Sequence, residues 1–204
     1  MVLRKTSLLV AAVAVSASFS VNQARAYDVW GIIAYDFSFA TGATRDFISD
    51  PGYIGISVEG RSFDKNHVST GFVIGWQNLY EKTDEIIQVD NVTISGTQVR
   101  YLDFLPILWG VNYHFGDRSY RLRPYLGAKV GTYYVSQRVD IGTVEIIVNR
   151  NWHLGVSPEA GVTFLTPTTD FYGFLKADYN YVFSRDDTID YSYVGLSIGF
   201  VYVF

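Results

Sequence analysis

The sequence predicts an all-β protein: an eight-stranded antiparallel up-and-down barrel that crosses a membrane. Two patterns carry this prediction. Apolar and polar residues alternate along eight runs, and the connectors between the runs are alternately long and short. Composition agrees, because 49% of the 204 residues are hydrophobic and 17% are aromatic, yet no apolar run beyond residue 21 could form a membrane-spanning helix. Alternating strands can instead turn one face to lipid and the other to a polar interior.

The N-terminal segment has the features of a secretory signal peptide. Two basic residues precede the apolar segment Ser7–Val21, and the tripeptide Ala24–Ala26 supplies a small-residue cleavage site. We therefore expect residues 1–26 to be removed and residues 27–204 to form one barrel domain outside the cytoplasm. Removal takes three of the 16 basic residues and no acid, so the mature charge is 13 − 20 = −7. An acidic protein is not expected to bind nucleic acid.

The eight runs are expected to be strands, since no window of comparable length has a helical period. They cover residues 29–40, 53–63, 68–81, 101–115, 122–138, 152–165, 170–183 and 191–204. The short connectors 64–67, 116–121 and 166–169 are rich in turn-forming residues. The long connectors are 41–52, 82–100, 139–151 and 184–190. This order places hairpin turns at one end of a barrel, with both termini, and loops at the other.

The faces of the strands differ in a way that favours a membrane barrel over a lipocalin or a soluble sandwich. One face carries no charge through the strand middles and ends in aromatic residues such as Tyr80, Tyr113 and Trp152. The other face carries four acids and four bases, which we expect to form an interior polar network: Asp36, Glu59, Arg61, Arg123, Lys129, Glu159, Lys176 and Asp178. Such charges persist inside a barrel only when they are paired.

The last strand carries the most specific sequence signal. Leu196, Ile198, Phe200, Tyr202 and the C-terminal Phe204 alternate on one face. Together with the segments VEGRSFDKNHVSTGFVIGW and LRPYLGAKVG, this series resembles the small outer-membrane β-barrel proteins of the OmpA/OmpX/opacity type. The resemblance implies an outer-membrane location, periplasmic termini and surface-exposed long loops. It implies that the C-terminal series is read by the barrel-assembly machinery, and that outer-membrane lipids and lipopolysaccharide surround a monomer. It does not imply one function.

The interior permits two interpretations. An eight-stranded barrel is just wide enough for side chains to fill it, so the polar network could replace a hydrophobic core and act as a plug. The alternative is a narrow channel for small solutes along the same network. We expect the plug.

Two long connectors have the composition of hairpins. The segments Glu85–Arg100 and Gln137–Asn149 carry β-branched residues on both sides of a Gly-containing turn. We expect them to extend the central strands into a raised sheet whose edge binds an extracellular protein or another surface ligand. A rigid, protease-resistant cap is the alternative. The connectors 41–52 and 184–190 are expected to be polar loops.

Catalysis is not expected. The chain has no cysteine and only three histidines, so neither a cofactor nor a metal site is expected. Lipid A deacylases of the PagL type carry a His and a Ser two residues apart on one strand. Here the similar placement holds Asp178 and Asn180, and the only His-x-Ser, His67–Ser69, falls on a periplasmic turn. A lipid-modifying enzyme is therefore the third and weakest hypothesis.

Overall fold

The computed structural model describes residues 29–65, 67–89, 92–117, 120–141, 144–165, 171–185 and 189–204. The expected signal peptide, residues 1–26, lies outside the described residues. Among the described residues, no helix is long and apolar enough to cross a membrane.

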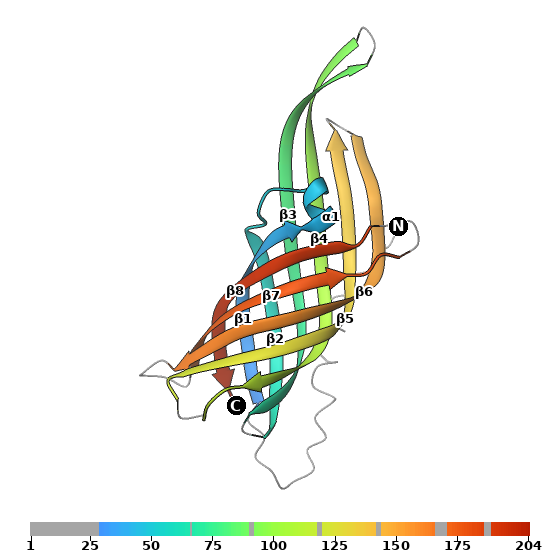
Figure 1. Cartoon of the computed structure of the whole chain (residues 1–204). Coiled ribbons are helices and arrows are strands. Elements are labelled where there is room, and N and C mark those ends of the chain that lie inside the picture. Colours follow the sequence, from blue (N-terminus) through green and yellow to red (C-terminus); the bar gives the residue numbers. More distant parts are fainter. Residues whose placement is uncertain are drawn as a thin grey trace, which may run out of the picture.

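Eight antiparallel strands close into one barrel, which confirms the predicted fold class (Figure 1). The strands are β1 (Val29–Thr41), β2 (Ile54–Lys65), β3 (Val68–Val89), β4 (Val92–His114), β5 (Leu122–Ile141), β6 (Val144–Leu165), β7 (Phe171–Val182) and β8 (Tyr191–Val203). Each strand pairs with its neighbour in sequence, and β1 closes the ring on β8 in a register that runs from Trp30↔Val203 to Thr41↔Ser192. The closed ring leaves the lower barrel without a sheet edge.

The outer surface of the barrel is apolar through its middle, as a membrane-spanning barrel requires. Outward side chains such as Ile33, Val58 and Leu154 are more than half exposed. Tyrosine, tryptophan and phenylalanine gather at both ends of this belt, where amphipathic rings suit the lipid–water boundary. Exposed aromatic residues of the loop end include Tyr35, Tyr53, Tyr80, Trp152 and Phe183, and those of the turn end include Tyr113, Phe115, Tyr202 and Phe204.

The four central strands continue far beyond the others, as the hairpin composition predicted. Strands β3 and β4 pair up to Val89↔Val92, and β5 and β6 pair up to Ile141↔Val144. Strand β4 pairs with β5 up to Gln98↔Ile141, at the tip of the β5–β6 hairpin, so only the β3–β4 hairpin continues beyond that level. We call this part the raised sheet (residues 82–89, 92–100, 137–141 and 144–151); it stands above the rest of the barrel in Figure 1.

The connector 41–52 is not the polar loop that was expected. It holds a short helix, α1 (Gly42–Phe47), and its Ile48 side chain is completely buried. The buried Thr44 Oγ1 accepts a hydrogen bond from the Ser192 backbone N–H at 2.7 Å. Arg100 donates from Nη1 to the Phe47 carbonyl at 3.0 Å. The helix therefore packs against the loop end of the barrel instead of extending into solvent.

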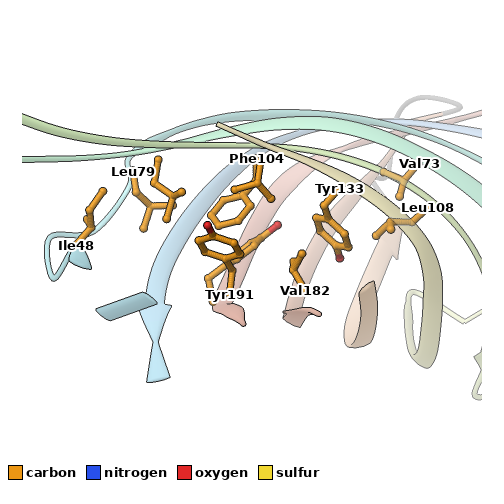
Figure 2. Packing of buried hydrophobic residues seen from close by; sticks show 11 residues of the cluster. Ile48, Val73, Leu79, Phe104, Leu108, Tyr133, Val182 and Tyr191 are labelled. Carbon is orange, nitrogen blue, oxygen red and sulfur yellow. The ribbon is translucent and has the colours of Figure 1, made fainter. Parts of the chain in front are cut away.

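The interior is also less polar than expected, because an apolar cluster lies at each end. The loop-end cluster includes Ile48, Leu79, Leu102, Phe104, Tyr133, Tyr191 and Tyr193. Figure 2 shows Phe104 and Tyr191 together in its centre, with ring centroids 6.0 Å apart. The turn-end cluster consists of Trp30, Ile32, Ala34, Phe63, Tyr125, Phe174 and Val201. At these positions both the interior and the lipid-facing residues are apolar. The sequence therefore shows a continuous apolar run there instead of an alternation of apolar and polar residues.

Candidate functional site: the barrel interior and the raised sheet

Four charged side chains form a closed ring of ion pairs in the middle of the barrel. Arg61 Nε lies 2.5 Å from Glu59 Oε1, and Arg61 Nη2 lies 3.1 Å from Glu159 Oε1. Lys129 Nζ completes the ring, at 2.9 Å from Glu59 Oε2 and 2.6 Å from Glu159 Oε2. All four side chains are almost inaccessible to solvent. Two acids and two bases thus neutralise one another, which is the condition for burying them.

A second polar chain continues from this ring toward the loop end. Lys176 Nζ lies 2.8 Å from Asp178 Oδ2, and Asn180 donates from Nδ2 to Asp178 Oδ1 at 2.5 Å. Tyr133 then donates its hydroxyl proton to Asn180 Oδ1 at 2.7 Å. Lys176 and Asp178 were both expected in the interior network. The links through the Asn180 amide and the Tyr133 hydroxyl group were not, because they depend on strand register.

The other two expected members lie at the borders of the network. Asp36 is buried on β1, paired in register with Ser197 of β8. Arg123 is buried nearer the turn end, where its guanidinium lies 5.2 Å from the centre of the Phe63 ring and 6.0 Å from that of Trp30. The structure therefore places all eight expected side chains inside the barrel and brings six of them into two directly paired groups.

Glycines leave the space that these long side chains need. A Cβ atom added at Gly195 would lie 2.3 Å from Asp178 Oδ1, and one added at Gly110 would lie 2.4 Å from Lys129 Cγ. Contacts this short require the neighbour to move. The inward glycines of β4 and β8 thus belong to the network as much as the charges do.

The sequence did not reveal a buried serine–histidine pair near the turn end. Ser69 Oγ lies 3.0 Å from His114 Nε2, and His67 Nδ1 lies 3.0 Å from the His114 carbonyl oxygen. Ser69 and His114 are on different strands, and only the β3–β4 register brings them together. Among the described residues, no group of three or more His, Asp or Glu side chains could hold a metal ion.

The C-terminal series faces outward. Leu196, Ile198, Phe200, Tyr202 and Phe204 are all exposed on the lipid side of β8 and its end. The Phe204 backbone N–H still donates to the Val29 carbonyl at 2.9 Å. The terminal residue is therefore held by its backbone, while its side chain stays accessible.

The raised sheet ends in an unpaired strand edge at β6. Pairing of β6 with β7 begins at Gly155↔Val182, and in the described part of the chain the residues 144–151 have no strand beside them on that side. Ile146, Ile147 and Val148 are 46%, 49% and 54% exposed along this edge. These three exposed β-branched residues give the free edge an apolar centre, which Glu145 and Arg150 flank and a β-bulge at Val148 interrupts.

Comparisons with known proteins agree with the architecture. No family model and no curated protein sequence matches the chain. Among solved structures, the chain is similar to the crystal structure of Neisserial surface protein A, with a TM-score of 0.55 and 17% identity over 87% of this chain and 97% of that one.

The fold is that of the small outer-membrane β-barrels. Two further barrels align over similar lengths. Ail, the attachment invasion locus protein of Yersinia pestis, aligns at 15% identity and a TM-score of 0.48, over 87% of this chain and 97% of that chain. The N-terminal β-barrel domain of Pseudomonas aeruginosa OprF aligns at 15% identity and a TM-score of 0.45, over 86% and 97%. At 17% identity the match to Neisserial surface protein A shows the fold alone, so the function of this chain has to be argued from its own residues.

Proposed function

We propose that this protein is a non-catalytic outer-membrane barrel that binds an extended segment of an extracellular protein at the free edge of β6. The observation that carries the proposal is the exposed edge 144–151, which stands above the lipid-facing aromatic residues. Exposed backbone N–H and C=O groups of an edge strand can pair with an incoming strand, and neighbouring side chains select it.

The side chains of the edge suggest what the partner carries. Ile146–Val148 would bury apolar side chains of the incoming strand. Glu145 lies between two arginines, with its Oε1 3.8 Å from Arg138 Nη1 and 3.6 Å from Arg150 Nη2. A partially exposed ion-pair cluster beside an apolar centre resembles the polar rim of a protein interface. The partner is therefore expected to be an extended peptide with alternating apolar residues.

The filled interior supports the proposal that the barrel does not conduct small solutes. The side chains of Arg61, Tyr125, Tyr133 and Phe174 are all at most 1% exposed, and Ile48, which follows α1, is buried in the loop-end cluster. In a barrel of this width such side chains leave little space for a continuous water path. The channel hypothesis thus requires the ion-pair ring to open.

Two observations support a protein without catalytic activity. Ser69 and His114 form a serine–histidine pair, and both have an exposed fraction of 0%. A substrate carbonyl could not approach Ser69 Oγ there. Asp178 and Asn180 both point into the barrel, away from any lipid substrate.

The experiment uses the protein in nanodiscs and an array of unstructured peptides with alternating apolar residues. The wild type should bind a subset of these peptides, and an Ile147→Lys/Val148→Lys variant should lose roughly tenfold or more in affinity. The control is Ile189→Lys, which charges an exposed apolar residue of the loop end outside the raised sheet. Equal binding by the edge variant and the wild type would exclude the β6 edge as the binding site.

A further inference from the structure

A cleft of about 590 Å³ opens on the outer side of the barrel, where the segment after α1 meets β3 and β4. Three tyrosines line it, Tyr53, Tyr80 and Tyr101, together with the polar side chains of Asp50 and Asn78. Its volume lies within the range of pockets that hold small ligands. Tyrosines alone are ordinary at a lipid–water boundary, but here they surround a hollow that also contains an amide and a carboxylate.

The walls of the cleft are held in place by hydrogen bonds. Gly52 exchanges two backbone hydrogen bonds with Ser38, at 2.8 and 2.7 Å. The Glu81 carboxylate accepts a hydrogen bond from the Asp50 backbone N–H at 3.3 Å. A Cβ atom at Gly52 would lie 2.4 Å from the Asn78 carbonyl oxygen, so the segment packs directly on β3. A site formed in advance loses less entropy when a ligand binds.

The lining selects against charged ligands. Among the described residues that line the cleft, none is a lysine, arginine or histidine, and the neighbouring Arg138 is already paired with Asp140 and Glu145. A phosphate or carboxylate would find no cation in the lining and would meet Asp50. A cationic headgroup is disfavoured too, because it would be repelled by the like charge of the Arg138 guanidinium, which lies 4.3 Å from the centre of the Tyr101 ring. The remaining class is a neutral molecule that combines apolar faces with hydroxyl groups.

We propose that this tyrosine cleft binds a neutral sugar ring. The rings of Tyr80 and Tyr101, with centroids 5.3 Å apart, would contact the C–H face of the sugar. The Asp50 carboxylate would accept protons from its hydroxyl groups, and the Asn78 amide, anchored by a 2.8 Å hydrogen bond to Asp103, would add a polar contact. Neither role is connected with the β6 edge.

The position of the cleft assigns the sugar to a glycolipid of the same membrane, given the membrane location proposed above. Ile54, at the lower border of the cleft, is 58% exposed and continues into the lipid-facing residues Ile56 and Val58 of β2. A lipid whose acyl chains lie along these residues would bring its headgroup to the three tyrosines. A soluble glycan would gain no contact from the apolar border.

The test places the protein in phosphatidylglycerol nanodiscs that contain equal small fractions of monogalactosyldiacylglycerol and phosphatidylcholine with matched acyl chains. Native mass spectrometry then counts the lipids that remain on the released barrel. Relative to its fraction in the nanodisc, we expect the galactolipid to be retained roughly tenfold more than either phospholipid. This excess should disappear in Tyr53→Leu/Tyr80→Leu. Tyr113→Leu, which removes an exposed tyrosine at the other end of the barrel, should retain the galactolipid like the wild type.

Each other outcome overturns the proposal in a defined way. Equal retention by the double variant would exclude the cleft as the site. Preferred retention of phosphatidylcholine would replace the sugar by a cationic group, and preferred retention of phosphatidylglycerol would replace it by an anion. Displacement of the galactolipid by an equal concentration of free methyl β-galactoside would assign the cleft to soluble glycans. Because every arm measures lipid retention, none depends on peptide binding at β6.

Discussion

Lys129 Nζ lies between two glutamates of different strands, 2.6 Å from Glu159 Oε2 and 2.9 Å from Glu59 Oε2. This lysine of β5 links Glu59 of β2 to Glu159 of β6 across the barrel interior, and Arg61 links the same two glutamates. Removing one partner of a buried ion pair leaves an uncompensated charge, which is more costly than replacing the whole pair.

Lys129→Glu should therefore open the barrel. The variant places a third carboxylate beside Glu59 and Glu159, at a cost of about 3–5 kcal/mol, and water should enter to solvate the charges. In planar bilayers we expect steady single-channel openings from the variant and silence from the wild type. The double variant Lys129→Glu/Glu159→Lys should restore silence in part. A folded, inserted Lys129→Glu barrel that stays silent would contradict the plug.

Gly195→Val should destabilise the barrel, because the added Cβ would lie 2.3 Å from Asp178 Oδ1 and displace the partner of Lys176. We expect a loss of about 1–3 kcal/mol or more in the free energy of unfolding, measured by urea titration in detergent micelles. The matched control is Gly60→Ala, where no atom lies within 4 Å of the added Cβ. Equal stability of the two variants would refute the role of the inward glycines.

The contact between Glu81 and the segment after α1 should depend on pH. Burial raises the pKa of the Glu81 carboxyl, but hydrogen bonds from Ser49 and Asp50 and the nearby charge of Arg100 outweigh it and hold the pKa below its ordinary value. Because the pKa of Glu81 is lower in the folded barrel than in the unfolded chain, the contact stabilises the folded state at a pH above the unfolded-chain pKa of Glu81. This stabilisation is lost as the pH falls through the lowered pKa of the folded state.

We therefore expect the NMR signals of the Ser49 and Asp50 amide protons to titrate at a pH below the ordinary glutamate pKa. In Glu81→Gln the same signals should not respond to pH in this range. A wild-type midpoint at the ordinary glutamate pKa would show that these hydrogen bonds do not form.

Phe204→Leu should slow assembly in cells more than it weakens the folded barrel. The Phe204 side chain is 76% exposed, so little packing is lost, while the backbone hydrogen bond to Val29 remains. We expect less heat-modifiable barrel in membrane fractions at unchanged refolding in detergent. Phe115→Leu, another exposed phenylalanine at the turn end, serves as the control. If Phe204→Leu and Phe115→Leu reduced the amount of heat-modifiable barrel in cells equally, the result would argue against a C-terminal assembly signal.

The strand pattern of the barrel could be predicted because burial and lipid contact alternate with a period of two. In β8 the outward Phe200 and the inward Val201 are distinguished by position alone. Charges such as Glu59 and Arg61 could be assigned to the interior because lipid-facing charges are costly. The pattern is uninformative where both faces are apolar, as around Trp30 and Ile32, since an apolar run does not show which face is inside.

Contacts between distant strands could not be predicted. Glu59 and Lys129 are 70 residues apart and Ser69 and His114 are 45 apart, and a shift of one residue in any register would separate them. The burial of Ile48 could not be predicted for a different reason. The six-residue helix before it is too short to show a helical period, and Ile48 is buried only because it packs into the apolar cluster at the loop end of the barrel.

The sequence by itself determined the barrel, its strand number, its lipid-facing surface and the presence of a balanced set of interior charges. These properties follow from local alternation and from the cost of placing charge in lipid. Only the tertiary structure decided which charges pair, that α1 packs against the loop end, that residues 144–151 of β6 form a free edge and that Tyr53, Tyr80 and Tyr101 line one cleft. Those features depend on strand register and ring closure, which bring together residues that no local pattern connects.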